Sequence, residues 1–131
     1  MPFPSIVIDP TAAHTHTIVF LHGRGDNIRS FTHSLHQWTT SSGQNLFETF
    51  PSFKWVTPEA PKRKCASAFD EWNQWFDVWN VQDFSEREEL QAVGLKEVIP
   101  EIKALLKSEV EAVGSWDRII LAGISMGGAT S

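Results

Sequence analysis

Short apolar runs separated by polar, glycine-containing segments divide the chain into strand-like and helix-like parts. Residues 5–8 form a short apolar run before an Asp-Pro pair, which is typical of an edge strand closed by a turn. Residues 15–21 pass from alternating to continuously apolar positions, as a strand does when it enters the middle of a sheet. Residues 54–57 predict a third short strand, followed by an irregular crossing over 58–68.

Two further stretches carry apolar residues at helical spacing. Residues 28–38 predict one helix and residues 85–113 a longer one, with apolar positions every three or four residues. Ser85 and Glu88 have the spacing of a capping box at the start of the longer helix. Pro100 predicts a kink or two abutting helices, and Gly114 is expected to end the segment.

The stretch 69–84 contains most of the tryptophan. Trp72, Trp75, Phe76 and Trp79 follow the i, i+3, i+4, i+7 spacing of one helical face. Two interpretations stay open: a stripe packed into the core, or an aromatic wall over a binding pocket. A helix on a membrane surface is disfavoured, because the segment is acidic and anionic lipid would repel it.

The end of the chain has a pattern typical of a catalytic serine. An apolar run over 119–122 leads into Gly123-Ile-Ser125-Met-Gly127, with a second glycine directly behind. Gly-x-Ser-x-Gly after a buried strand predicts a nucleophile elbow, a sharp turn from strand to helix. Gly123 and Gly127 are expected because a Cβ at either position would collide with the neighbouring turn. The alternative is an ordinary glycine-rich turn.

The order strand, helix, strand, with glycine-rich loops at the strand ends, predicts an α/β protein. Its sheet is expected to be mostly parallel and flanked by helices. The loop at 22–27, His-Gly-Arg-Gly-Asp-Asn, follows the buried strand at the sheet edge where ligands of such proteins bind. We therefore expect this loop to lie beside the elbow.

An acyl transfer at this edge would need a base and donors for an oxyanion. Ser125 is a poor nucleophile until a base removes its proton. The backbone amides of Met126 and Arg24 are the expected oxyanion donors, since one follows the nucleophile and the other lies in the early loop. His22 could serve as the base, but a structural hydrogen-bonding role is favoured, because α/β-hydrolases place their histidine after the serine and the acid.

Composition excludes several classes of function. The chain has 131 residues, a net charge of −5 and a pI of about 5.4, which disfavours nucleic acid as a partner. The basic run at 62–64 is expected to be a solvated loop. No nucleotide-binding glycine motif is present, and Cys65, the one cysteine, forms no intrachain disulfide. Residues 1–5 lack the features of a signal peptide, and no apolar run predicts stable membrane insertion, so a cytoplasmic location is expected.

Three blocks of sequence together resemble one family. They are Phe20-Leu-His-Gly-Arg-Gly-Asp-Asn27, Trp75-Phe-Asp77 and Arg118-Ile-Ile-Leu-Ala-Gly-Ile-Ser-Met-Gly-Gly-Ala129. In order and spacing they are similar to the phospholipase/carboxylesterase family, which includes the acyl-protein thioesterases. The resemblance implies an α/β-hydrolase fold that cleaves carboxylic esters or thioesters of acyl chains, an acylated protein among them. It implies neither a metal nor an organic cofactor.

The resemblance also implies roles for individual residues. Ser125 would be the nucleophile, and the amides of Arg24 and Met126 the oxyanion hole. The tryptophan stretch would contribute substrate-binding side chains, namely Trp75, Phe76 and Trp79. The structural part of the motif would comprise His22, Gly23, Gly123 and Gly127.

The chain departs from the family in two respects. Met126 stands where the family usually carries glutamine, and Arg24 where it carries leucine or a similar residue. The family's catalytic aspartate and histidine also lie after the elbow, and no residue of this chain corresponds to them. We therefore expect residues 1–131 to be the N-terminal part of a single, incomplete domain with little or no turnover and marginal stability. The alternative is a non-catalytic remnant that acts as an interaction module; the oligomeric state stays open.

Overall fold

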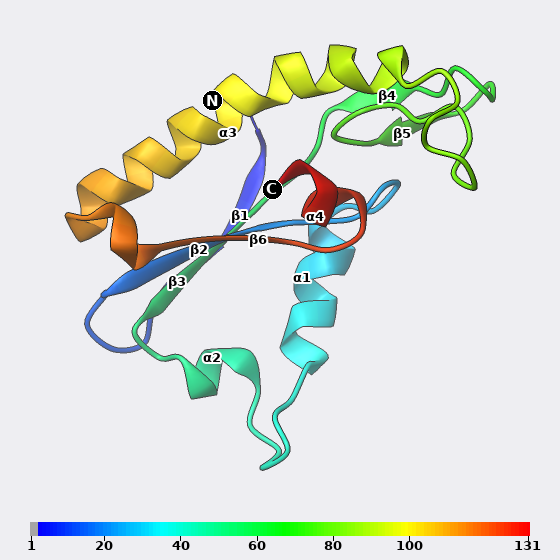
Figure 1. Cartoon of the computed structure of the whole chain (residues 1–131). Coiled ribbons are helices and arrows are strands. Elements are labelled where there is room, and N and C mark those ends of the chain that lie inside the picture. Colours follow the sequence, from blue (N-terminus) through cyan, green and yellow to red (C-terminus); the bar gives the residue numbers. More distant parts are fainter. Residues whose placement is uncertain (1–2) are drawn as a thin grey trace.

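A sheet with helices on both faces forms the body of the molecule (Figure 1). The structure is a computed structural model and describes residues 3–131, so Met1 and Pro2, the start of the segment judged not to be a signal peptide, lie outside it. Within the described residues the main sheet has the order β1–β3–β2–β6. These strands span Ser5–Ile8, Phe53–Pro58, His16–Leu21 and Ile119–Gly123 respectively. Only β1, at one edge, runs antiparallel to its neighbour, which confirms the mostly parallel sheet.

The helices lie on opposite faces of this sheet. In Figure 1, α3 (Glu89–Val113) crosses above it, whereas α1 (Ile28–Gln37) and α2 (Leu46–Thr49) lie below. A short 3-10 turn, η1 (Trp116–Arg118), leads into β6, and α4 (Met126–Thr130) follows that strand directly. No helix formed by residues 3–131 combines the length and hydrophobicity needed to cross a membrane.

Strand β2 is buried on both faces, as its continuous apolar sequence predicts. Val19 and Leu21 belong to the core beneath α3 and are fully buried. Phe20 points the other way and packs edge-to-face on Phe31 of α1, with ring centroids 5.2 Å apart. Because successive side chains of a strand alternate in direction, one strand supplies the centre of both layers.

A partly buried ion pair connects α3 to the sheet. Glu109 on α3 accepts hydrogen bonds from Lys54 Nζ of β3 at 3.1 Å and from Thr17 Oγ1 of β2 at 3.2 Å. Only 8% of Glu109 is exposed. A carboxylate at that depth is tolerated because both of its oxygens have partners.

The helix predicted over 69–84 is wrong. This stretch contains β5 (Glu71–Asn73), which pairs antiparallel with β4 (Lys62–Lys64), and then continues through turns. Contacts distant in sequence determine its path, because the Trp75 indole N–H donates to the His22 carbonyl at 2.9 Å. The helical spacing of the aromatic residues therefore does not reflect a helix in this stretch.

The basic run at 62–64 is not the solvated loop expected from its charge. Arg63 of β4 forms an ion pair with Glu97 of α3 at 2.7 Å, and its Nε donates to the Gln74 carbonyl at 3.1 Å. Its side chain is 14% exposed, so the central residue of the run ties the small sheet to α3.

The capping box predicted at Ser85 is also absent. Helix α3 begins at Glu89, and its N-cap, Glu88, makes no side-chain cap hydrogen bond. The Ser85 hydroxyl donates instead to Asp83 Oδ1 at 2.6 Å, and this bond lowers the pKa of the Asp83 carboxyl. Arg87, between the two residues of the predicted box, has a φ of 51°, so the backbone does not follow the helical path that would bring the Glu88 amide to the Ser85 oxygen.

Pro100 neither breaks α3 nor divides it in two. The helix runs continuously from Glu89 to Val113, and Figure 1 shows it as one arc over the sheet. Gly114 ends it in the left-handed region, with φ of 88°, as its position after the last apolar residue predicted.

Gly94 provides a test of how closely α3 packs on the segment after β5. A Cβ at Gly94 would lie 2.5 Å from Phe76 Cα and 2.7 Å from the Trp75 carbonyl oxygen. We expect Gly94→Ala to lower the free energy of unfolding by about 1–3 kcal/mol through overpacking, although alanine is the better helix former by about 1 kcal/mol. Urea denaturation followed by circular dichroism measures the change.

The matched control is Glu101→Ala, on the exposed side of the same helix. It should change the free energy of unfolding by no more than about 0.5 kcal/mol. A Gly94→Ala chain as stable as the control would contradict the close contact between α3 and residues 75–76.

Candidate active site

Ser125 lies at the junction between β6 and α4, where the nucleophile elbow was predicted. Its backbone angles are φ 54° and ψ −119°. These values are near those of the first central residue of a type II′ turn, a position that glycine dominates. A serine with this backbone is strained and persists only where its surroundings fix it.

Two close backbone contacts fix the elbow. A Cβ at Gly123 would lie 2.2 Å from the Gly127 carbonyl oxygen. A Cβ at Gly127 would lie 2.2 Å from the carbonyl oxygen of Leu21 and 2.6 Å from that of His22. The predicted need for glycine at both positions is confirmed, since the first turn of α4 rests directly on the end of β2.

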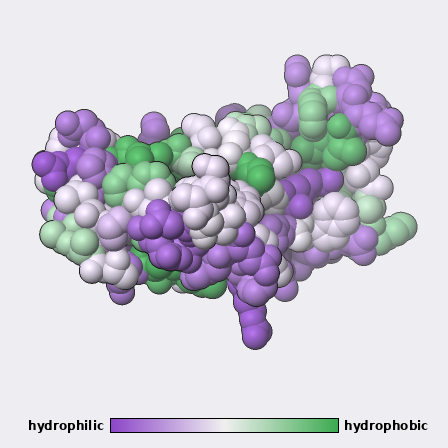
Figure 2. All heavy atoms as spheres, turned by 90° about the horizontal axis from the view of Figure 1, so that it is seen from below, coloured by the Kyte–Doolittle hydropathy of each residue, from purple (hydrophilic) through white to green (hydrophobic). Residues whose placement is uncertain are grey.

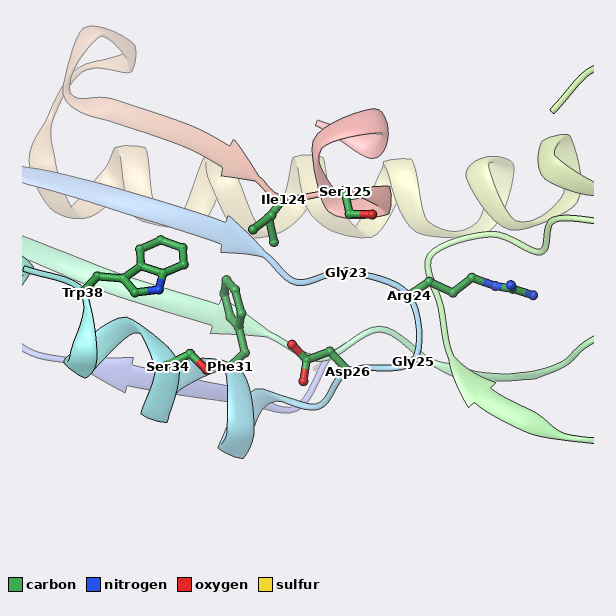
Figure 3. Close-up of a pocket in the computed structure, with 9 residues that line it drawn as sticks. All are labelled: Gly23, Arg24, Gly25, Asp26, Phe31, Ser34, Trp38, Ile124 and Ser125. Atoms are coloured by element: carbon green, nitrogen blue, oxygen red, sulfur yellow. The ribbon is translucent and has the colours of Figure 1, made fainter. Parts of the chain in front are cut away.

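The loop after β2 lies beside the serine, because β2 and β6 are paired neighbours in the sheet. A Cβ at Gly23 would lie 3.5 Å from Ser125 Cβ. The Ile124 amide donates to the Leu21 carbonyl at 3.1 Å, which joins the elbow to the start of this loop. Figure 3 shows residues 23–26 passing next to Ile124 and Ser125.

His22 is a buried structural residue by its contacts. Its Nδ1 lies 2.7 Å from the Gly23 carbonyl oxygen, and its Nε2 accepts the Ala60 amide at 3.0 Å. Since a carbonyl oxygen only accepts, Nδ1 carries the proton and the ring is the neutral tautomer. With both nitrogens engaged and no side-chain exposure, the imidazole is not available to remove a proton from Ser125.

The three aromatic residues predicted to bind substrate have different surroundings in the structure. Trp75 is fully buried, and its indole N–H donates to the His22 carbonyl. It therefore supports the loop and does not face a substrate. Trp79 donates to Glu86 Oε1 at 3.0 Å and packs under the guanidinium of Arg87. Of the three, only Phe76 lines a cavity that reaches Ser125.

Two cavities meet at Ser125 and Arg24. One, here called the polar pocket, has a volume of about 610 Å³ and lies between the loop after β2, helix α1 and the elbow (Figure 3). Its lining residues are Gly23, Arg24, Gly25, Asp26, Phe31, Ser34, Trp38, Ile124 and Ser125.

The other, here called the apolar groove, has a volume of about 700 Å³. It is lined by Arg24, Phe76, Val78, Val81, Phe84, Gln91, Ser125, Met126 and Ala129. Sequence reasoning missed most of its walls, because the helix predicted over 69–84 gave no reason to group Val78, Val81 and Phe84. Figure 2 shows hydrophobic side chains at the surface toward the end of the molecule that carries β4 and β5. Among the residues that line the groove, Phe84 and Val81 are exposed.

Arg24 lines both cavities, and its side chain makes several contacts with other elements. Its Nε donates to Gln74 Oε1 at 2.8 Å, and its guanidinium lies over the Trp72 ring. Nη2 is 3.6 Å from Asp77 Oδ1. In Figure 3 the side chain extends away from Phe31 and Trp38. The sequence indicated this position only because an arginine stands where the family carries leucine or a similar residue.

The two amides predicted to form an oxyanion hole are both open. Neither the Arg24 amide nor the Met126 amide donates a hydrogen bond to any group within residues 3–131. Both belong to residues that line the apolar groove next to Ser125. Their assignment as oxyanion donors stays a prediction.

No histidine of the described chain lines either cavity. His33 and His36 lie on α1, where their rings bond to Gln37 and to the Thr32 carbonyl. His14 and His16 lie at the opposite end of β2 from the loop. Among residues 3–131, therefore, no imidazole is positioned to act on Ser125.

The profile of the phospholipase/carboxylesterase family matches residues 4–131. The chain belongs to this family. It is 33% identical over 125 residues to acyl-protein thioesterase 1 of Cryptococcus neoformans var. neoformans serotype D, an alignment that covers 95% of this chain and 49% of that protein. The chain spans about half the length of the curated relatives it matches.

Solved structures agree with the family and the fold. The crystal structure of Zea mays acyl-protein thioesterase 2 has a TM-score of 0.65 and 28% identity, and covers 98% of this chain and 48% of that one. The structure of esterase PE8 has a TM-score of 0.67 at 23% identity, covers 95% of this chain and 53% of that one, and supports the fold alone. The predicted α/β-hydrolase fold is confirmed.

Gly127 and Gly128 form a matched pair that tests the elbow. Both lie in the first turn of α4, so alanine has a similar effect on helix propensity at each. At Gly128 the nearest atom to a new Cβ is the Gly123 carbonyl oxygen at 3.2 Å, a far milder contact than at Gly127. We expect Gly127→Ala to cost about 1–3 kcal/mol more than Gly128→Ala in the free energy of unfolding, because its Cβ meets backbone.

Chemical denaturation of both variants measures the difference. Equal losses for the two variants would mean that the end of β2 can move away from α4, and the proposed constraint on Ser125 would not hold.

Proposed function

We propose that this chain carries the nucleophile and oxyanion hole of a serine hydrolase that cleaves carboxylic esters or thioesters of acyl chains. The observation that carries the proposal is the strained Ser125 backbone at the meeting point of two cavities. Membership of the phospholipase/carboxylesterase family supports it. The relatives are named for hydrolysis of acyl-protein thioesters, so an acylated protein is the substrate we favour.

The two cavities suggest how a substrate would lie. The apolar groove, with Phe76, Val78 and Val81 among its walls, suits an acyl chain. The polar pocket, which contains Asp26 and Ser34, suits the alcohol or thiol that leaves. In this arrangement the scissile carbonyl lies at Ser125. Ser125 and Arg24 are the two residues that line both cavities.

The chemistry at Ser125 would follow the usual course of acyl transfer. The hydroxyl attacks the carbonyl carbon, and negative charge develops on the carbonyl oxygen. The open amides of Arg24 and Met126 would stabilise that charge. Donors fixed in the backbone need little reorganisation as the charge forms, so both side chains can vary without loss of this role.

Turnover also requires a base, and residues 3–131 bring no histidine to the serine. His22 is buried with both nitrogens bonded, and the other histidines line neither cavity. We propose that the base comes from other residues of the same protein or from a partner. The 131-residue chain by itself is then inactive, because a neutral serine hydroxyl is a poor nucleophile.

Fluorophosphonate labelling of the purified 131-residue chain tests this part of the proposal. We expect its intact mass to be unchanged after exposure, since Ser125 is not deprotonated. The Ser125→Ala chain is the control. An adduct that the control lacks would show that these residues do contain a working base, and the proposed need for an external base would be wrong.

The hydrolase proposal itself is tested with the longest product of the gene. If the coding sequence continues past Ser131, that product should be labelled at Ser125 and should hydrolyse acyl thioesters, and Ser125→Ala should abolish both. A folded product that is neither labelled nor active would overturn the proposal and favour a non-catalytic interaction module.

A further inference from the structure

The Arg24 guanidinium is a cation in the wall of an otherwise uncharged groove. The other residues that line the apolar groove are hydrophobic, apart from the neutral Gln91 and Ser125. The side chain of Arg24 is 16% exposed, so much of the charge has lost its contact with water. A cation held in this way needs partners to offset the loss of hydration.

The partners within the protein occupy only part of the guanidinium. An arginine has five N–H donors, and the bond from Nε to Gln74 uses one. Nη2 has two long contacts, with Asp77 Oδ1 at 3.6 Å and Cys65 Sγ at 3.7 Å. Nη1 has no hydrogen-bond partner within residues 3–131.

Asp77 offsets the charge only incompletely. Its Oδ2 accepts the Ala66 amide at 2.8 Å, and its Oδ1 accepts the Val78 amide at 2.9 Å. The carboxylate is thus held by two backbone bonds at a longer distance from Arg24 than an ion pair of ideal geometry. Donors of the guanidinium are left for a ligand in the groove.

We propose that Arg24 makes the apolar groove a binding site for long-chain fatty-acid anions. The carboxylate accepts the open N–H groups of the guanidinium, and the hydrocarbon chain lies along Phe76, Val78, Val81 and Phe84. The inference rests on the proposed function in one respect, namely that the groove takes an acyl chain. It adds that the free acid binds more tightly than a neutral molecule with the same chain.

This preference gives the site a form of regulation. Hydrolysis of an acyl ester or thioester releases a fatty acid, which is an anion at neutral pH. If Arg24 binds that anion, the product stays in the groove and competes with the next substrate. A neutral side chain at position 24 would leave the groove without this attraction.

Isothermal titration of the 131-residue chain with dodecanoate and with dodecanol, both below their micelle concentrations, tests the inference. The two ligands share one chain length and differ in head-group charge. We expect dodecanoate to bind about tenfold more tightly, as a charge-assisted hydrogen bond predicts. Arg24→Leu should remove the difference between the two ligands, because it removes the charge that distinguishes them. The variant keeps the Arg24 backbone amide, so the comparison isolates the side chain.

Two controls make each outcome decisive. Phe84→Ser, at an exposed lining position, should weaken both ligands and thereby confirm where the chain lies. If Arg24→Leu fails to fold, the wild-type preference should still fall as salt rises, since ions screen the attraction.

Equal binding of the two ligands to the wild-type chain, or a preference that survives Arg24→Leu, would overturn the inference and leave the proposed function intact. Binding of neither ligand to the folded chain would overturn the acyl groove itself.

Discussion

The contact between the first turn of α4 and the end of β2 determines where the serine lies. The Gly127 backbone approaches the carbonyl oxygens of Leu21 and His22 so closely that any side chain there is excluded. Because β2 and β6 are adjacent, this contact brings the turn after one strand against the loop after the other. The position of Ser125 is therefore a property of two neighbouring strand ends packed without intervening side chains.

The small two-stranded sheet holds the other side of the site in place. Asn73 of β5 accepts the Gly25 amide at 2.8 Å through its carbonyl, and its side chain donates to the Asp26 carbonyl at 3.1 Å. Gln74 binds the Arg24 side chain, and Trp75 binds the His22 carbonyl. Four of the five loop residues from 22 to 26 are thus bonded to three successive residues of β5 and the turn after it. These contacts fix the loop and leave the Arg24 amide without a hydrogen-bond partner within residues 3–131.

Much of this arrangement follows from local sequence. The apolar runs that became β1, β2, β3 and β6, and the glycines around Ser125, report directly on burial and on close backbone approach. His22 could be assigned a structural role from the chain order of hydrolase triads, and its two hydrogen bonds agree with that role.

The stretch 69–84 could not be derived in the same way. Aromatic spacing there suggested one face of a helix, whereas Trp75 and Phe76 are buried by α3 and by the loop after β2, and Trp72 stays at the surface. The same limit applied at Ser85, where the positive φ of Arg87 takes the backbone out of the helical path, and at Arg24, whose guanidinium contacts groups 41 and 50 residues away. Local turns and distant contacts leave no periodic trace in a sequence.

The backbone of Ser125 has a consequence for how the chain would drift under mutation. Its left-handed φ costs about 1–3 kcal/mol for a residue with a side chain, and glycine would be free of that cost. A lineage selected for folding alone would gain by replacing the serine with glycine. The chain nevertheless carries a serine at position 125, in a conformation that lowers the stability of the fold. At this position the demands of stability and of chemistry are therefore opposed.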